Sequence, residues 1–294
     1  MELKKVSIFA NGEPQSELIS GRLKQKLEKS GFTASCEFDP DASLLICIGG
    51  DGSFLHTLHA YDFPEIPIVG VNTGHLGFFQ ELHHAELDEF IFRYENRLYE
   101  IQSLRPVVAE IDSCGLIGDE HGRAPAEEAA PEKAETLKKA ESGGGFPRAL
   151  KGLNEIVVRN SRSRAAHLNI FIGESFIERF SGDGILVSTP AGSTAYNYAL
   201  GGSIVDPRLS LLQITPIAPI NNAVYRSFTS SVLLPPDLSV QIFPEYTKDQ
   251  EMSVSADGME WRFSGVKRIR VGFARRTVQL LRFDSYDFWK KVKG

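Results

Sequence analysis

Residues 43–55 read SLLICIGGDGSFL, an apolar run that breaks into Gly-Gly-Asp-Gly and then resumes with helical spacing. This order is typical of a buried strand, a glycine-rich loop and the start of a helix. Without side chains, Gly49, Gly50 and Gly52 let backbone amides approach a ligand, and the following helix N-terminus favours phosphate. Asp51 lies among them, and a carboxylate beside phosphate indicates a role with a metal ion or in proton transfer. An ordinary turn explains the stretch alone equally well, and its spacing matches neither the dinucleotide-binding loop nor the nucleoside-triphosphatase loop.

Further strands and helices flank this stretch. Apolar runs at 5–10 and 67–72 predict two more strands, and apolar residues at helical spacing predict helices within 18–27 and 87–94. Strands without polar alternation, separated by helices, are typical of a parallel sheet covered on both faces. Ligands of such sheets bind beyond the carboxyl ends of the strands, where Asp51 and the 72–78 loop both lie. Residues 1–100 are therefore expected to form an α/β nucleotide-binding lobe with a Rossmann-like parallel sheet.

Residues 101–283 are expected to form an all-β, sandwich-like lobe, because short strands alternate with turn signals. The expected strands are 156–159, 168–172, 175–180, 185–188, 239–243, 252–256, 267–273 and 277–283. Residues 113–147 are rich in Pro, Gly and charge and poor in bulky apolar residues, which predicts a mobile excursion. The aromatic tail, 284–294, is expected to dock on the first lobe.

Composition excludes several classes of partner. The net charge is −6, so no basic stripe is available for nucleic acid. The three cysteines lack Cys-x-x-Cys spacing, which favours a reducing, cytoplasmic location. Residues 1–10 lack the apolar core of a signal peptide, and no run of about 18 apolar residues occurs, so no membrane span is expected.

A second polar region lies in the β-rich half. Residues 181–197, SGDGILVSTPAGSTAYN, join a glycine turn, a strand and another polar loop. A hairpin turn followed by a helix N-cap at Ser193 or Thr194 accounts for this segment equally well when it is considered alone. Upstream, Asn154 and Glu155 stand at a strand start and carry the groups that can hold the vicinal hydroxyls of a ribose, although exposed strand residues often look the same.

Taken together, the 49–52 loop, the 154–155 pair and the 182–196 segment resemble the NAD kinases in identity and order. The 72–78 loop and the glycines at 201–202 add to the likeness, which covers most of the chain. Gly-Gly-Asp-Gly is shared with phosphofructokinases and with diacylglycerol and sphingosine kinases, whereas the Ser-Thr-Pro-x-Gly-Ser-Thr-Ala-Tyr segment is specific. Ala191 and Ala199 depart from the family pattern, which has hydroxyl residues there.

The resemblance implies a kinase that transfers a phosphoryl group from ATP or polyphosphate to the adenosine 2′-hydroxyl of NAD, giving NADP. Asp51 would accept the hydroxyl proton, while Gly49, Gly50 and Gly52 hold phosphates with the help of Mg²⁺ or another divalent cation. The family also forms homo-oligomers, here a dimer or tetramer. Which residues hold the metal is unknown.

Other positions follow from the same resemblance. It implies that Asn154 and Glu155 bind ribose hydroxyls, that Asp183 meets an amide or hydroxyl of the dinucleotide, and that the adenine end is bound by Thr194, Ala195 and Tyr196. Weaker candidates, for which packing, capping or an exposed histidine is an equal explanation, are Asn72, Asn197, Ala218, His56 and His167. Asp257 either completes the pocket or forms a hairpin turn with Gly258.

Two alternatives stay open at this point. A lipid kinase of the diacylglycerol type shares the glycine loop but needs a basic or apolar membrane-docking face, and vesicle co-sedimentation would distinguish it. A sensor that binds NAD or NADP without turnover is the other. Asp51 argues against the sensor, because binding alone would be better without a carboxylate beside the phosphates.

Overall fold

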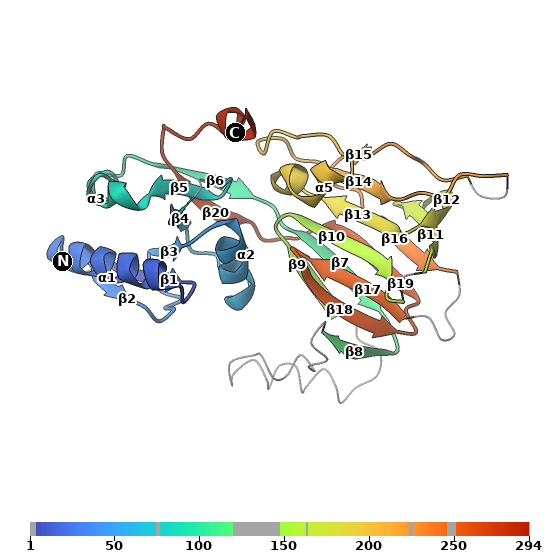
Figure 1. Cartoon of the computed structure of the whole chain (residues 1–294), viewed down its shortest axis with the longest axis horizontal. Helices are drawn as coiled ribbons and strands as arrows, with labels where there is room; N and C mark the ends of the chain where they lie inside the picture. The colour runs from blue at the N-terminus through green and yellow to red at the C-terminus, as the bar shows by residue number, and fades with distance from the viewer. Residues whose placement is uncertain are drawn as a thin grey trace. The chain divides into compact units, whose positions relative to one another are not determined.

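The structure, a computed structural model, describes residues 4–74, 77–119, 148–162, 164–223, 226–245 and 251–293. The chain divides into two compact units. Unit 1 comprises Met1–Leu104 and Arg276–Gly294, and unit 2 comprises Arg105–Arg275. In Figure 1 unit 1 contains the blue and teal elements together with the red C-terminal end of the chain.

Unit 1 is an α/β unit built on one sheet. Its elements are β1 (Lys5–Ala10), α1 (Pro14–Lys29), β2 (Thr33–Ser35), β3 (Leu44–Ile48), α2 (Asp51–Ala60), β4 (Ile68–Asn72), β5 (Gln80–His83), the 3₁₀ turn η1 (His84–Glu86), α3 (Leu87–Glu95), β6 (Glu100–Leu104), β20 (Val278–Arg282) and α6 (Phe288–Lys293). The strand order is β2-β1-β3-β4-β20-β6, with β5 beside β4. All described pairings are parallel except that of β6 with β20. The expected α/β lobe is confirmed, with a mixed sheet.

Helices cover both faces of this sheet because β3 is apolar on both sides. Ile46 belongs to a core cluster with the apolar residues of α1 and α3, among them Leu23 and Phe90. The next residue, Cys47, points to the other face, since successive side chains of a strand alternate. There its Sγ lies 3.2 Å from Thr57 Oγ1 of α2. The buried strand therefore runs between helices and delivers its carboxyl end to the glycine loop.

Strand β20 corrects the sequence-based assignment. The sequence places 277–283 in the β-rich lobe, but β20 lies between β4 and β6 in the sheet of unit 1. It pairs in parallel with β4 through Leu280 and Ile68, and antiparallel with β6. Because these partners are about two hundred residues away in sequence, local patterning predicts a strand here but not the sheet to which the strand belongs.

Unit 2 is all-β apart from two short turns. Its elements are β7 (Val107–Asp112), β8 (Gly115–Asp119), β9 (Arg148–Gly152), β10 (Glu155–Asn160), β11 (Ala166–Ile172), β12 (Ser175–Gly182), β13 (Gly184–Ser188), η2 (Ala191–Thr194), α5 (Tyr196–Ala199), β14 (Leu212–Ile217), β15 (Val232–Leu234), β16 (Val240–Pro244), β17 (Glu251–Ala256), β18 (Met259–Ser264) and β19 (Arg268–Phe273). One sheet has the order β15-β14-β13-β10-β17-β18-β8, and the other β12-β11-β16-β19-β7-β9. The expected sandwich-like lobe is confirmed.

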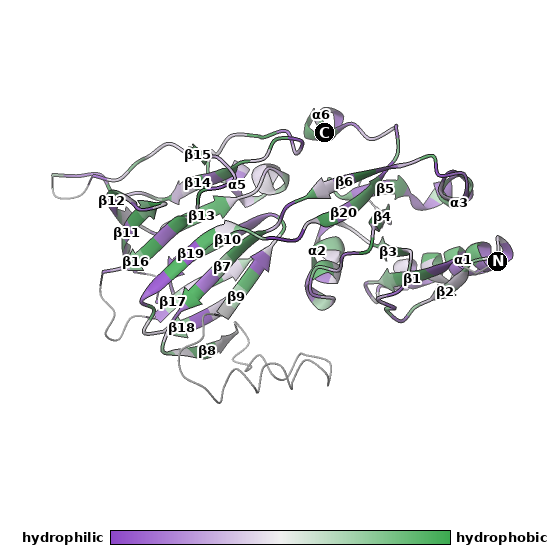
Figure 2. Ribbon diagram, turned by 180° about the vertical axis from the view of Figure 1, so that it is seen from behind, coloured by the Kyte–Doolittle hydropathy of each residue, from purple (hydrophilic) through white to green (hydrophobic). Residues whose placement is uncertain are grey.

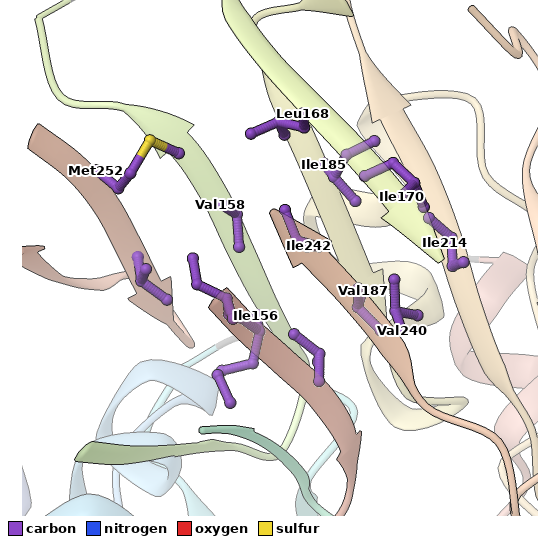
Figure 3. Close-up of a cluster of buried hydrophobic side chains, with 14 of the residues drawn as sticks. Ile156, Val158, Leu168, Ile170, Ile185, Val187, Ile214, Val240, Ile242 and Met252 are labelled. Atoms are coloured by element: carbon purple, nitrogen blue, oxygen red, sulfur yellow. The ribbon is translucent and has the colours of Figure 1, made fainter. Parts of the chain in front are cut away.

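One apolar core joins the two sheets of unit 2. Figure 3 shows Ile156 and Val158 of β10 facing the same interior as Ile170 of β11 and Ile242 of β16, and all four are fully buried. Strands of this sandwich alternate in hydropathy, as the colours of β19 show in Figure 2. In the sequence of β19, Ile269 and Val271 alternate with arginines. The all-β prediction itself depends on the short strands and the turn signals between them.

The boundary of the predicted excursion also needs correction. Residues 115–119, assigned by sequence to a mobile segment, form the edge strand β8, which pairs antiparallel with β18. The rest of that predicted excursion, 120–147, lies outside the described residues. Within the part of the chain that the structure describes, no helix is long and apolar enough to cross a membrane.

Candidate functional site

Asp51 occupies the first position of α2, directly after the Gly50 N-cap. Its Oδ2 accepts a hydrogen bond from the Phe78 amide at 2.9 Å, and its Oδ1 accepts one from the Phe79 amide at 3.0 Å. A helix N-terminus and two backbone donors all favour the negative charge of this carboxylate. The two loops expected at the carboxyl edge of the sheet therefore meet at Asp51, which is held in one orientation before any ligand binds.

The glycines of these loops serve different purposes. Gly49 has φ +149°, and a Cβ there would overlap Ser53 Oγ. A Cβ on Gly77 would overlap Asp51 Oδ1. In contrast, a Cβ on Gly50 or Gly52 would have no atom within 4 Å. The first two glycines are required by packing inside unit 1, while the other two leave the outer side of the loop open for close approach by a ligand.

The two remaining candidates in unit 1 are less closely linked to Asp51. Asn72 is buried, donates from Nδ2 to Gly74 O at 2.7 Å, and accepts from Gly74 N at 2.9 Å, so its side chain stabilises its own loop. His56 is exposed on α2, with its ring 5.8 Å from that of Phe9.

In unit 2, Asp257 organises the segment that carries Asn154 and Glu155. Its carboxylate accepts hydrogen bonds from the amides of Leu153 and Asn154, each at 2.7 Å, and from the Glu155 amide at 3.3 Å. Asp257 has φ +50° in the hairpin between β17 and β18, a conformation that Asp tolerates better than most residues. The sequence offers pocket and turn as alternatives for Asp257. The structure shows a turn whose side chain fixes the candidate binding pair.

Glu155 and Asn154 carry buried polar atoms without partners. Among the described residues, Glu155 Oε2 and Asn154 Oδ1 are both buried and make no hydrogen bond. Burial, and to a smaller extent the charge of Asp257, together raise the pKa of Glu155 to about 8. The carboxyl group is therefore neutral at pH 7 and can donate one hydrogen bond and accept others. Buried orphan atoms of this kind are expected where a ligand completes the hydrogen bonds.

The loop after β13 lies directly against this pair. Thr189 donates from its amide to Asn154 O at 2.9 Å and from Oγ1 to Leu153 O at 2.6 Å. A Cβ on Gly192 would overlap the Asn154 carbonyl oxygen, so only glycine permits this approach. The structure thus brings together the 154–155 pair and the loop leading to Thr194 and Ala195, both of which are half-buried.

Tyr196 continues the same surface. Its hydroxyl accepts a hydrogen bond from Arg159 Nη2, and the guanidinium carbon of Arg159 lies 5.3 Å from the centre of its ring. Arg159 Nε is buried without a partner among the described residues. Sequence reasoning missed Arg159, although a charged residue near the end of the apolar strand β10 is a signal that could have singled it out.

Asp183 lies at the opposite end of β13 from Glu155. Glu155 pairs with Ser188, whereas Gly184, next to Asp183, pairs with Arg159. Four residue steps at about 3.3 Å place these ends about 13 Å apart, a separation suited to an extended, multi-part ligand. The Asp183 side chain is exposed, and its amide donates to Ile217 O at 2.9 Å.

The last three candidates in unit 2 contact neighbouring residues of the same unit. Ala218, with φ +44°, follows β14, and a Cβ on Gly182 would lie 2.9 Å from its carbonyl oxygen. His167 Nδ1 lies 2.9 Å from Ser181 Oγ. Asn197 is fully buried; its Nδ2 donates to Ser193 O at 3.2 Å and its Oδ1 accepts from Thr215.

The described residues contain no group of three or more His, Cys, Asp or Glu side chains arranged to hold a metal ion. Mg²⁺ differs from zinc or calcium in that it is usually held through one or two carboxylates together with the phosphates of a substrate. A magnesium ion of this kind does not require a cluster of three or more protein ligands.

Comparison with known proteins places the chain in a family. Residues 11–99 match the ATP-NAD kinase N-terminal domain, and residues 153–283 match the ATP-NAD kinase C-terminal domain. The chain is 34% identical to a protein named NAD kinase from Finegoldia magna over 292 residues, which cover 99% of this chain and 97% of that protein. It is 29% identical to an NAD kinase from Streptococcus gordonii over 298 residues, covering 99% and 94% of the two chains.

Solved structures share the fold. Yeast NADH kinase, crystallised with NADH, superposes with a TM-score of 0.76 at 19% identity and covers 100% of this chain and 87% of the yeast chain. An NAD kinase from Archaeoglobus fulgidus in complex with ATP has a TM-score of 0.70 at 18% identity, covering 99% and 97%. Together with the matches to both domains and the near-complete coverage by curated relatives, these observations show that the chain belongs to the ATP-NAD kinase family.

Proposed function

We propose that this protein is an NAD kinase, which transfers a phosphoryl group from ATP or polyphosphate to the 2′-hydroxyl of the adenosine ribose of NAD and yields NADP. The observation that carries the proposal is Asp51, an oriented carboxylate beside a glycine loop whose Gly50 and Gly52 face open space. The glycine loop of the N-terminal domain, considered without the rest of the chain, is also compatible with a lipid kinase or a sensor. The match to the ATP-NAD kinase C-terminal domain favours the kinase of a dinucleotide.

Asp51 acts as the general base. It accepts the proton of the 2′-hydroxyl while that oxygen forms a bond to the terminal phosphorus of the donor, and the bond from this phosphorus to the leaving phosphate oxygen breaks. A positioned carboxylate base contributes about 10²- to 10⁴-fold to such a step. The amides of Phe78 and Phe79 use one side of the carboxylate and leave its other lone pairs for the proton.

The glycine loop and a divalent cation bind the donor. Backbone amides around Gly50 and Gly52 and the N-terminus of α2 attract its phosphates, and Gly49 keeps the turn that presents them. Mg²⁺ or another divalent cation bound with the donor would neutralise the charge that develops on phosphoryl transfer.

Unit 2 binds NAD. Glu155 and Asn154 offer their unpartnered atoms to ribose hydroxyls, and Tyr196, with Thr194 and Ala195, forms the surface for the adenine end. Asp183, at the far end of β13, meets an amide or hydroxyl elsewhere on the dinucleotide. Asn72, Asn197, Ala218 and His167 shape the loops around these positions. His56, exposed on α2, contributes at most a phosphate contact.

The assembly is proposed to be a homo-oligomer, either a dimer or a tetramer. Phe176 and Ile177 are neighbours on the edge strand β12, and their side chains are 56% and 43% exposed. Such exposed apolar side chains support contact with another subunit at this edge. Light scattering during size-exclusion chromatography measures the oligomeric state directly.

A coupled assay tests the proposed activity. Purified protein, Mg²⁺, a donor (ATP or polyphosphate) and an acceptor (NAD or NADH) are combined, and the product is detected with an NADP-specific dehydrogenase. We expect NADP only when the donor, acceptor and protein are all present. The absence of NADP with every donor and acceptor pair would overturn the proposal.

A further inference from the structure

Segment 77–80 comprises the last residues of the connection from β4 to β5 and the first residue of β5, and it makes hydrogen bonds on two sides. Its amides at 78 and 79 donate to Asp51. Its carbonyls face two cations of the C-terminal part of the chain. Lys291 Nζ donates to Gly77 O at 2.8 Å and to Gln80 O at 2.5 Å, and Arg282 donates to the carbonyls of residues 78 and 79 at 3.4 and 3.3 Å. All four carbonyls of the segment thus accept from Lys291 or Arg282.

The two cations are themselves fixed within unit 1. Arg282 is buried, pairs with Glu81 at 3.1 Å, and lies 3.7 Å from the ring centre of Tyr286. Lys291 Nζ lies 4.8 Å from the centre of the same ring. At the start of α6, Phe288 is buried with its ring 5.9 Å from that of Phe78. The end of the chain is therefore packed against the loop that orients Asp51.

The positive charge of Lys291 lowers the free energy of unfolding of the protein. The pKa of Lys291 is lowered from 10.5 to about 8, first by burial and then by the charge of Arg282, while the charges of Glu81 and Asp51 oppose the shift. Because the folded protein binds this proton less tightly than the unfolded chain, this group makes folding less favourable below pH 8, and stability recovers as the pH rises from 8 to 10.5. A residue retained at such a disadvantage is a candidate for a role other than stability.

We propose that Lys291 is a positioning residue for Asp51, holding segment 77–80 by the carbonyls of Gly77 and Gln80 so that the next amides keep the carboxylate in its reactive orientation. The proposal rests on the proposed function in that Asp51 is taken as the base. Lys291 touches neither substrate nor reacting atoms. It acts only through the peptide groups of the segment, whose hydrogen bonds on the two sides reinforce each other.

The mechanism predicts a dependence on pH. The charged groups that face Lys291 are Asp51 on α2, Glu81 on β5 and Arg282 on β20, together with the phenol ring of Tyr286. Among these groups, the ammonium of Lys291 loses its proton near pH 8. When Lys291 loses this proton, its hydrogen bonds to the carbonyls of Gly77 and Gln80 weaken. We therefore expect kcat to fall above about pH 8. An arginine at this position stays charged and would move that fall to higher pH.

The test compares Lys291→Gln and Lys291→Arg with Lys290→Gln as a matched control, since the Lys290 side chain is 83% exposed. In the full-length protein, we expect Lys291→Gln to lower kcat about tenfold, because small displacements of a catalytic group have large effects. KM for NAD should stay within about twofold, since ground-state binding is unaffected. The Lys290→Gln protein should behave as wild type, and Lys291→Arg should retain kcat and lose the fall near pH 8.

Amide hydrogen exchange provides a readout that needs no turnover. In Lys291→Gln the amides of Phe78 and Phe79 should exchange faster than in wild type, while those of unit 2 stay unchanged; thermal unfolding verifies that the variant is folded. Unchanged exchange together with unchanged kcat in the folded variant would overturn the proposal. The same alkaline fall in Lys291→Arg would overturn the pH mechanism. If the wild type makes no NADP, the proposed function fails, while the exchange data still decide whether Lys291 holds the segment.

Discussion

Asp51 in unit 1 and Glu155 in unit 2 are both acidic residues beside polar loops, yet their surroundings are opposite. Both Asp51 oxygens accept backbone hydrogen bonds, and a helix N-terminus favours the charge. Glu155 is 6% exposed, its Oε2 has no partner among the described residues, and its pKa is raised to about 8 by burial and then by Asp257. Asp51 is hydrogen-bonded through both of its oxygens, whereas Glu155 is neutral at pH 7 and has one oxygen without a partner among the described residues.

This contrast separates two kinds of functional group. An oriented, hydrogen-bonded carboxylate is ready for chemistry because no reorganisation is needed when the reaction begins. A buried polar atom without a partner costs about 1–3 kcal/mol, so its retention indicates that a bound ligand supplies the missing hydrogen bond. Mutations in unit 1 should therefore affect turnover, and those around Glu155 should affect NAD affinity.

The largest effect is expected for Asp51→Asn. Asparagine keeps the shape of the side chain but cannot accept a proton at neutral pH, so kcat should fall by about 10² to 10⁴. The dissociation constant for NAD, measured by calorimetry, should change little. Asp41→Asn, an exposed carboxylate in the same unit, serves as the control and should leave both constants unchanged. Near-normal kcat in Asp51→Asn would show that the base lies elsewhere.

A smaller loss is expected for Gly77→Ala. The new Cβ would overlap Asp51 Oδ1 and Gln80 Oε1 and must push the carboxylate aside. We expect kcat to fall about 10- to 100-fold, with little change in NAD affinity. Gly74→Ala in the same loop is the control, because a Cβ there has no atom within 4 Å. Equal activity of the two variants would mean that the orientation of Asp51 is unimportant.

Sequence reasoning located these two regions unequally well. The strand, loop and helix around Asp51 are encoded locally: as the sequence predicts, β3 ends directly before the glycines and a helix, α2, begins within the loop. The pattern also indicated that the loops after β3 and β4 would meet, because parallel strands share an edge. The donors that orient Asp51 could not be named, since which amides of the second loop face it depends on tertiary packing.

Contacts between distant residues were beyond the reach of local patterns. Asp257-Gly258 is recognisable as a turn, but nothing near it in sequence shows that its carboxylate caps three amides about a hundred residues away. Arg282 and Lys291 were missed for the same reason, although an arginine in the apolar strand β20 is a visible anomaly. The roles of the individual site residues stay predictions until the variants are measured.

The effect of Asp257→Asn should appear mainly in binding. Asn tolerates the positive φ of this turn, but it has one acceptor oxygen where Asp257 serves three amides, and its amino group would face a donor. The segment around Asn154 should loosen, and we expect the dissociation constant for NAD to rise about tenfold. Asp237→Asn, an exposed residue of unit 2, is the matched control. A fall in kcat with unchanged NAD affinity would contradict the assignment of this region to binding.

The smallest effect on function is expected for Glu155→Gln. Glutamine resembles the neutral carboxyl group, which is the form of Glu155 below its pKa of about 8, so NAD affinity at pH 7 should change by no more than about threefold. Above pH 8 the wild-type group ionises beside the Asp257 carboxylate, and its affinity should weaken, whereas that of the variant should not.

Stability gives Glu155→Gln an independent signature. With a folded pKa of about 8 against 4.5 for the ordinary group, the folded protein binds the Glu155 proton more tightly than the unfolded chain, so wild-type stability falls as the pH rises from 4.5 to 8. Glutamine removes this loss. Thermal melts at pH 8 should show a variant more stable by about 4 kcal/mol, since each of the roughly 3.5 pKa units of the shift corresponds to about 1.4 kcal/mol. If Glu155→Gln instead lost NAD affinity more than tenfold at pH 7, the ionised carboxylate would be the binding form. Asp51 and Glu155 would then differ only in their hydrogen-bond partners and not in the charge form that acts.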